Sequence, residues 1–111
     1  MEAMKTTKSK LIEVDETNFE AEVLRSTTPV VMAFTSDNCG PCRLLKPFLE
    51  ALANDLGSAK FVTVDVEVNE RLVRGHGINA VPSLLVFRQG KEVDRMVGLG
   101  GLVRLREALG I

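Results

Sequence analysis

The only two cysteines of the chain stand in the tetrapeptide Cys39-Gly40-Pro41-Cys42. Two thiols separated by two residues can open and close a disulfide with little movement of the backbone, which indicates redox chemistry. The pair follows an apolar run at residues 30–34 and opens a segment with helical periodicity. We therefore expect Cys39 at a helix N-terminus, where free backbone amides and the helix dipole favour a thiolate.

The expected chemistry is thiol–disulfide exchange with Cys39 as the nucleophile and Cys42 as the resolving thiol. Attack by the Cys39 thiolate gives a mixed disulfide, and Cys42 then attacks the Cys39 sulfur and releases the reduced substrate. Arg43 and Lys46 are expected one helical turn from the two cysteines, where they favour a thiolate, whereas Asp37 opposes it. An inert buried bridge or half of a metal site are the alternative interpretations of the pair.

Periodicity along the chain predicts the elements that position this motif. Strands are predicted at residues 11–14, 30–34, 60–66, 83–87 and 93–97, and helices at 17–26, 40–56, 69–75 and 100–109. Thr17 and Glu20 have the capping-box spacing, and Gln89-Gly90 predicts a tight hairpin turn. Leu45 and Leu49 recur on a buried helix face, with Phe48 expected alongside. The order β-α-β-α-β-α-β-β-α predicts an α/β fold, with a mixed sheet and helices on both faces.

Length and composition favour one ordinary globular domain. The chain has 111 residues, of which 45% are hydrophobic, and a net charge of −1. With this balanced composition, neither nucleic acid nor a membrane is expected as a partner. Residues 1–9 are interpreted as a flexible N-terminal extension and residues 10–111 as the domain. The first ten residues carry no apolar stretch of a secretory signal, which favours the cytoplasm, where disulfides are usually transient. His76, the only histidine, is expected at the surface, and neither a metal nor another cofactor is expected.

Several motifs in this order resemble those of the thioredoxin family across residues 11–111. They are Cys39-Gly40-Pro41-Cys42, Pro47 in the following helix, Val81-Pro82-Ser83, the hairpin at Gly90, and Val97-Gly98. The resemblance implies a thioredoxin-like three-layer sandwich with a central mixed sheet. It also implies disulfide-containing protein substrates and an electron donor of the thioredoxin-reductase type. We expect a monomer.

The resemblance also implies a substrate-binding surface around the cysteines. Pro82 resembles the family's cis-proline, next to which the backbone of Val81 would pair with an extended substrate segment. Gly98 would form a second wall, because a residue without a side chain permits close approach. The set is completed by the neighbours of the cysteines, Asn38, Gly40 and Pro41.

Four positions depart from the family's pattern. Asn38 stands where the family has a tryptophan before the first cysteine, and Thr35 replaces another aromatic residue. Ala33 replaces a buried aspartate and Thr63 a lysine expected beside it, so their joint loss leaves no unpaired buried charge. The family's candidate proton acceptor for Cys42 is then missing, and we expect water or the leaving thiolate to accept that proton.

Two other classes of function remain open. The first is a protein-binding module that uses the surface at Val81 and Gly98, with redox turnover weak or incidental. The second is a metal or iron–sulfur centre bridged between two chains, because one chain offers only two cysteines and one histidine.

Overall fold

The computed structural model describes residues 10–110, in the predicted order of elements. The strands are β1 (Ile12–Glu13), β2 (Val30–Thr35), β3 (Lys60–Asp65), β4 (Ser83–Arg88) and β5 (Lys91–Val97). The helices are η1 (Glu20–Leu24), α2 (Gly40–Asp55), α3 (Glu70–Gly75) and α4 (Gly101–Ala108). The predicted flexible extension, residues 1–9, lies outside the described residues.

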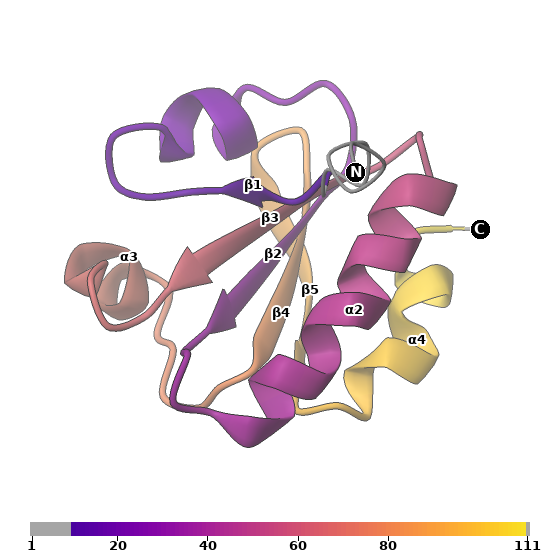
Figure 1. Ribbon diagram of the computed structural model, residues 1–111. Helices are drawn as coiled ribbons and strands as arrows, with labels where there is room; N and C mark the ends of the chain where they lie inside the picture. The colour runs from indigo at the N-terminus through magenta and orange to yellow at the C-terminus, as the bar shows by residue number, and fades with distance from the viewer. Residues whose placement is uncertain (1–9, 111) are drawn as a thin grey trace, which may run out of the picture.

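The strands form one mixed sheet in the order β1-β3-β2-β4-β5. Strands β1, β3 and β2 run parallel, whereas β4 is antiparallel to β2, and β5 is antiparallel to β4. Figure 1 shows α2 and α4 on one face of the sheet and α3 on the other. This arrangement confirms the predicted three-layer α/β fold.

Strand β2 is buried on both faces, which explains its apolar run. Val31 and Ala33 belong to the core under α2 and α4, whereas Met32 and Phe34 belong to the core under η1 and α3. All four side chains are fully buried. Because β2 lies between β3 and β4, the residues that follow its C-terminal end lie near the middle of the sheet, where the strands end.

The predicted capping box at Thr17 and Glu20 is wrong, because the reciprocal cap lies two residues earlier. Asp15 Oδ1 accepts from the Asn18 amide at 3.3 Å, and Asn18 Oδ1 accepts from the Asp15 amide at 2.8 Å. The Thr17 hydroxyl is used as a donor to Asp15 Oδ1, and Glu20 pairs with Arg25. Asp and Asn form this cap as readily as Thr and Glu, so the spacing alone did not distinguish the two registers.

The hairpin between β4 and β5 is confirmed. Gln89 and Gly90 both have positive φ, 53° and 81°, as a two-residue turn of type I′ requires. A Cβ at Gly90 would also lie 2.9 Å from the Leu24 carbonyl oxygen, so glycine is needed there for space as well as for conformation.

Helix α2 presents its predicted leucine face to the sheet, with Leu45 and Leu49 buried. The prediction for Phe48 is wrong, since 59% of this side chain is exposed. Phe48 precedes Leu49 by one residue and therefore lies about 100° around the helix from the buried face.

Within residues 10–110 no helix is both long and apolar enough to cross a membrane.

Candidate active site

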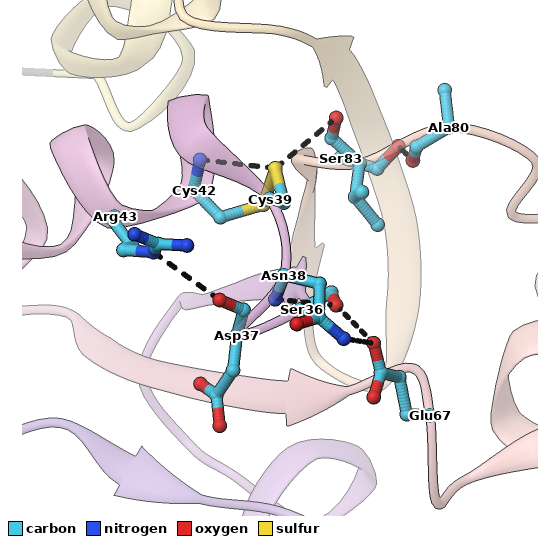
Figure 2. The surroundings of a disulfide bond; sticks show 10 residues. Ser36, Asp37, Asn38, Cys39, Cys42, Arg43, Glu67, Ala80 and Ser83 are labelled. Carbon is cyan, nitrogen blue, oxygen red and sulfur yellow. Dashed lines mark hydrogen bonds between the residues drawn. A yellow bond between two sulfur atoms is a disulfide. The ribbon is translucent and has the colours of Figure 1, made fainter.

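The two cysteines lie where β2 passes into α2, as predicted. Cys39 is the N-cap of α2 with extended backbone angles (φ −109°, ψ 116°), and Pro41 lies in the first turn. Cys39 and Cys42 form a disulfide with their Cα atoms 5.2 Å apart. The Cys42 amide donates to Cys39 Sγ at 3.1 Å, as Figure 2 shows. This backbone donor is placed to stabilise negative charge on the Cys39 sulfur after reduction.

The two sulfur-bearing residues differ in accessibility. Only 4% of Cys42 is exposed, whereas Cys39 is half-buried. An external disulfide therefore meets Cys39 first, whereas Cys42 lies on the buried face of α2. This difference is what a nucleophile and a resolving thiol require.

The predicted substrate-binding residues Val81, Pro82 and Gly98 lie together beside Cys39. Cys39 Sγ is 3.9 Å from the Val81 carbonyl oxygen, and the Val81–Pro82 peptide bond is cis, as expected. The Gly98 amide donates to the Pro82 carbonyl at 2.8 Å. Gly98 has φ +83°, and a Cβ built there meets no atom within 4 Å, so its outer side is open.

Asn38 is held by a contact that the sequence did not reveal. The Glu67 carboxylate accepts hydrogen bonds from the Ser36 hydroxyl and from Asn38 Nδ2, the latter at 3.0 Å (Figure 2). These two bonds, that from Ser36 above all, lower the pKa of Glu67 from its usual 4.5. The Ser36 carbonyl in turn accepts from the Cys39 amide at 3.2 Å. The loop before α2 is thus fixed by polar contacts at the position of the family's tryptophan.

Arg43 is oriented toward the loop. Its Nε donates to the Asp37 carbonyl at 3.2 Å, as drawn in Figure 2. This bond ties the first turn of α2 to the residues before Cys39. The sequence predicted Arg43 near the thiolate through its charge, but did not predict that its Nε would bind the backbone of Asp37.

The replaced positions Ala33 and Thr63 are direct partners in the β2–β3 register, as their joint replacement suggested. Ala33 is fully buried and Thr63 half-buried. The next pair on the same face is Thr35 and Asp65. Cys42 shares with Thr35, Thr63 and Asp65 the lining of a cavity of about 330 Å³. The small side chains of Thr35 and Thr63 therefore leave space beside the buried Cys42.

The prediction of a surface position for His76 is wrong, because the residue is half-buried. Its ring packs edge-on against Phe19 and Phe87, with centroids 5.3 and 5.9 Å away, and is tilted against Phe34. Its Nδ1 lies 2.9 Å from the Leu72 carbonyl oxygen. Those phenylalanines belong to the core on the opposite face from α2, so His76 is not a base for the cysteines. Short-range sequence patterns carried no signal for this long-range aromatic packing.

A metal site receives no support from the described part of the chain. Residues 10–110 contain no group of three or more His, Cys, Asp or Glu side chains able to hold a metal ion. The buried polar side chains of that part all have hydrogen-bond partners.

A redox-active cysteine pair at the N-terminus of a helix, facing a cis-proline loop on a mixed sheet, defines a thiol–disulfide exchange site. Comparison with known proteins agrees: the Thioredoxin family model matches residues 10–109. The thioredoxin of Chlorobaculum thiosulfatiphilum is 38% identical over 90 residues, covering 80% of this chain and 83% of its own. That of Rickettsia bellii (strain RML369-C) is 36% identical over 87 residues, covering 78% and 83%. The thioredoxin of Mycobacterium bovis (strain ATCC BAA-935 / AF2122/97) is 34% identical over 103 residues, covering 92% and 89%.

The chain belongs to the thioredoxin family and is a dithiol–disulfide oxidoreductase.

Proposed function

We propose that this protein reduces disulfides of other proteins, with Cys39 as the nucleophile and Cys42 as the resolving thiol. The observation that carries the proposal is the asymmetry of the pair. Cys39 is accessible, and its sulfur accepts a hydrogen bond from the Cys42 amide. Cys42 is only 4% exposed and lies within reach of Cys39. Only the accessible sulfur can meet an external disulfide, and only its neighbour can then displace the substrate.

The substrate is an extended protein segment bound along the cis-proline loop. The Val81 carbonyl lies at the Cys39 sulfur, and the open side of Gly98 leaves room for a second backbone. Main-chain pairing of this kind accepts many sequences, because it uses groups that every residue has. Asn38, Gly40 and Pro41 form the remaining rim, and Asn38 offers a polar contact where the family has an aromatic one.

Electrons reach the disulfide from a reductase of the thioredoxin-reductase type, and the protein acts as a monomer in the cytoplasm. The Gly-Pro pair between the cysteines resembles that of reducing members of the family. Measurement of the Cys39–Cys42 reduction potential tests this direction of electron flow, which predicts a value near that characteristic of thioredoxins, about −270 mV. A potential near about −120 mV would instead indicate an oxidant.

Insulin reduction tests the proposal. Wild-type protein should accelerate reduction well beyond dithiothreitol alone. Cys39→Ser should abolish this activity, and Cys42→Ser should stop turnover while accumulating a mixed disulfide through Cys39. Loss of that adduct in Cys42→Ser, or activity in Cys39→Ser, would contradict the assigned roles. If wild-type protein gives no acceleration but Cys39→Ser and wild type bind a protein partner equally, the protein is a binding module.

A further inference from the structure

The buried side of Cys42 opens into the cavity of about 330 Å³ beneath the first turns of α2. This volume is well above the roughly 10–15 Å³ that one water needs, so water can enter the cavity. Among residues 10–110 its charged lining comes from β1, β3, the loop before α2, and α2 itself. These residues are Glu13, Asp37, Arg43, Lys46, Glu50 and Asp65.

Resolution of a mixed disulfide requires that Cys42 lose its proton, because the thiolate and not the thiol attacks. Direct exchange with bulk solvent is restricted, since only 4% of Cys42 is exposed. The nearby strand pair offers no base: Ala33 has no polar group, and the Thr63 hydroxyl is not a proton acceptor at neutral pH. The cavity that Cys42 lines instead offers polar side chains and space for water.

Of the carboxylates around the cavity, Asp65 is the best placed. It is the register partner of Thr35 and so lies on the sheet face toward α2, at the strand ends where that helix begins. Its side chain is half-buried and fixed, since Oδ1 accepts from the Glu67 amide at 2.9 Å. A carboxylate held by one such bond can still accept several more from water.

The other carboxylates are less suitable. Glu13 and Asp37 are exposed to solvent. Glu50 follows Cys42 by eight residues on α2, which places it about 12 Å along the helix axis. Arg43 and Lys46 are cations and do not accept the proton.

We propose that Asp65, through water in this cavity, accepts the Cys42 proton when the mixed disulfide is resolved; this rests on the proposed function. The proton passes from Cys42 to water and from water to Asp65. The Cys42 thiolate forms a bond to Cys39 Sγ, and the bond between Cys39 and the substrate sulfur breaks. The electron pair leaves on the substrate thiolate, which takes a proton from solvent, while Asp65 returns its proton to solvent. The dithiol loses two electrons, and the substrate disulfide gains them.

A single-turnover reaction of the fully reduced protein with dithiobis-nitrobenzoate separates the two steps, because each releases one coloured thiolate. The first release reports attack by Cys39, and the second reports resolution by Cys42. In Asp65→Asn the second release should slow on the order of tenfold to a hundredfold near pH 7. This is the low end of the rate acceleration that a positioned general base usually contributes, or somewhat less. The first release should be unchanged. Raising the pH past the ordinary thiol pKa of about 8.5 should restore the rate.

Matched variants make the result specific. Asp65→Ser keeps an oxygen that can accept from the Glu67 amide and should be slow like Asp65→Asn, whereas Asp65→Glu should recover most of the rate. Glu13→Gln removes a charge from the same cavity at an exposed position and should leave both releases unchanged.

Second releases in Asp65→Asn and Asp65→Ser that equal the wild-type release at every pH would overturn the proposal. So would an equal slowing in Glu13→Gln, which would indicate an effect of total charge. Failure of the proposed function looks different, because the wild-type protein itself would then not accelerate insulin reduction.

Discussion

Replacing Ala33 by aspartate places a carboxylate on a fully buried position of β2, opposite Thr63. Burial can raise a carboxyl pKa by up to 3–5 units. We take about 3 units for the folded state, because the cavity beside Thr63 allows partial hydration. At 1.36 kcal/mol per unit, the ionised form then costs about 4 kcal/mol of stability.

The direction of the pH dependence follows from the raised pKa. Below the unfolded value of about 3.9 the new carboxyl is protonated in both states, and only the cost of burying a neutral polar group remains. Between about pH 4 and pH 7 the folded state holds the proton more tightly, so stability falls by about 1.4 kcal/mol per pH unit. Above the folded pKa of about 7 the loss is complete and constant.

Urea unfolding of Ala33→Asp at several pH values measures this loss, with Ala33→Asn as the control of similar size. The asparagine variant should lose stability equally at pH 5 and pH 8, whereas the aspartate variant should lose more at pH 8. Equal losses for Ala33→Asp at both pH values would refute the claim that this position is buried and without a compensating charge. The same variant should also change the pH dependence of disulfide reduction, because it offers Cys42 a proton acceptor. An unchanged pH dependence would count against the expectation that, without an aspartate at position 33, water or the leaving thiolate accepts the Cys42 proton.

Three further predictions concern other parts of the site and core. Gly98→Ala should fold but lose about 1–2 kcal/mol of stability, because φ is +83° although there is space for a Cβ. Its rate of insulin reduction should fall by more than the unfolded fraction explains. Full activity would show that Gly98 is not part of the substrate surface. Ser36→Ala should raise the Glu67 pKa toward 4.5 in an NMR titration. In wild type, the stabilisation from the lowered pKa is present above pH 4.5 and is lost as the pH falls through the folded pKa. An unchanged Glu67 pKa in the variant would contradict the hydrogen bond from Ser36. Leu49→Ala should cost about 2–5 kcal/mol in urea unfolding and Leu44→Ala, 61% exposed, within about 0.5 kcal/mol; similar losses would contradict the packing of α2.

The sequence predicted the order of elements, because strands and helices here carry strong periodic patterns. The apolar run in β2 indicated a strand covered on both faces, and Gln89-Gly90 indicated the hairpin. Both signals are local and need no knowledge of distant contacts. The N-terminal cap was placed wrongly for the same reason: Asp15 and Thr17 are both good caps, and their competition is settled by tertiary context.

The cysteine motif and its cis-proline partner were also predictable, the first from spacing and the second from family resemblance. The contacts that hold them were not. Glu67 lies 29 residues from Asn38 along the chain, and His76 packs with phenylalanines from β2, β4 and the N-cap position of η1. No local pattern marks such pairs. The cavity beside Cys42 has a partial signal, since Thr63 in its lining stands where the family has a lysine, but its volume and the rest of its lining require the structure.

Rates of alkylation of the two thiols in the reduced, folded protein test the central claim most directly. Iodoacetamide labelling followed by peptide mapping should show Cys39 modified quickly and Cys42 slowly, in keeping with their exposure. The rate at Cys39 should titrate below the ordinary thiol pKa of about 8.5. If both cysteines resist the reagent, or if Cys42 reacts first, Cys39 is not the nucleophile and the proposed catalytic cycle is wrong.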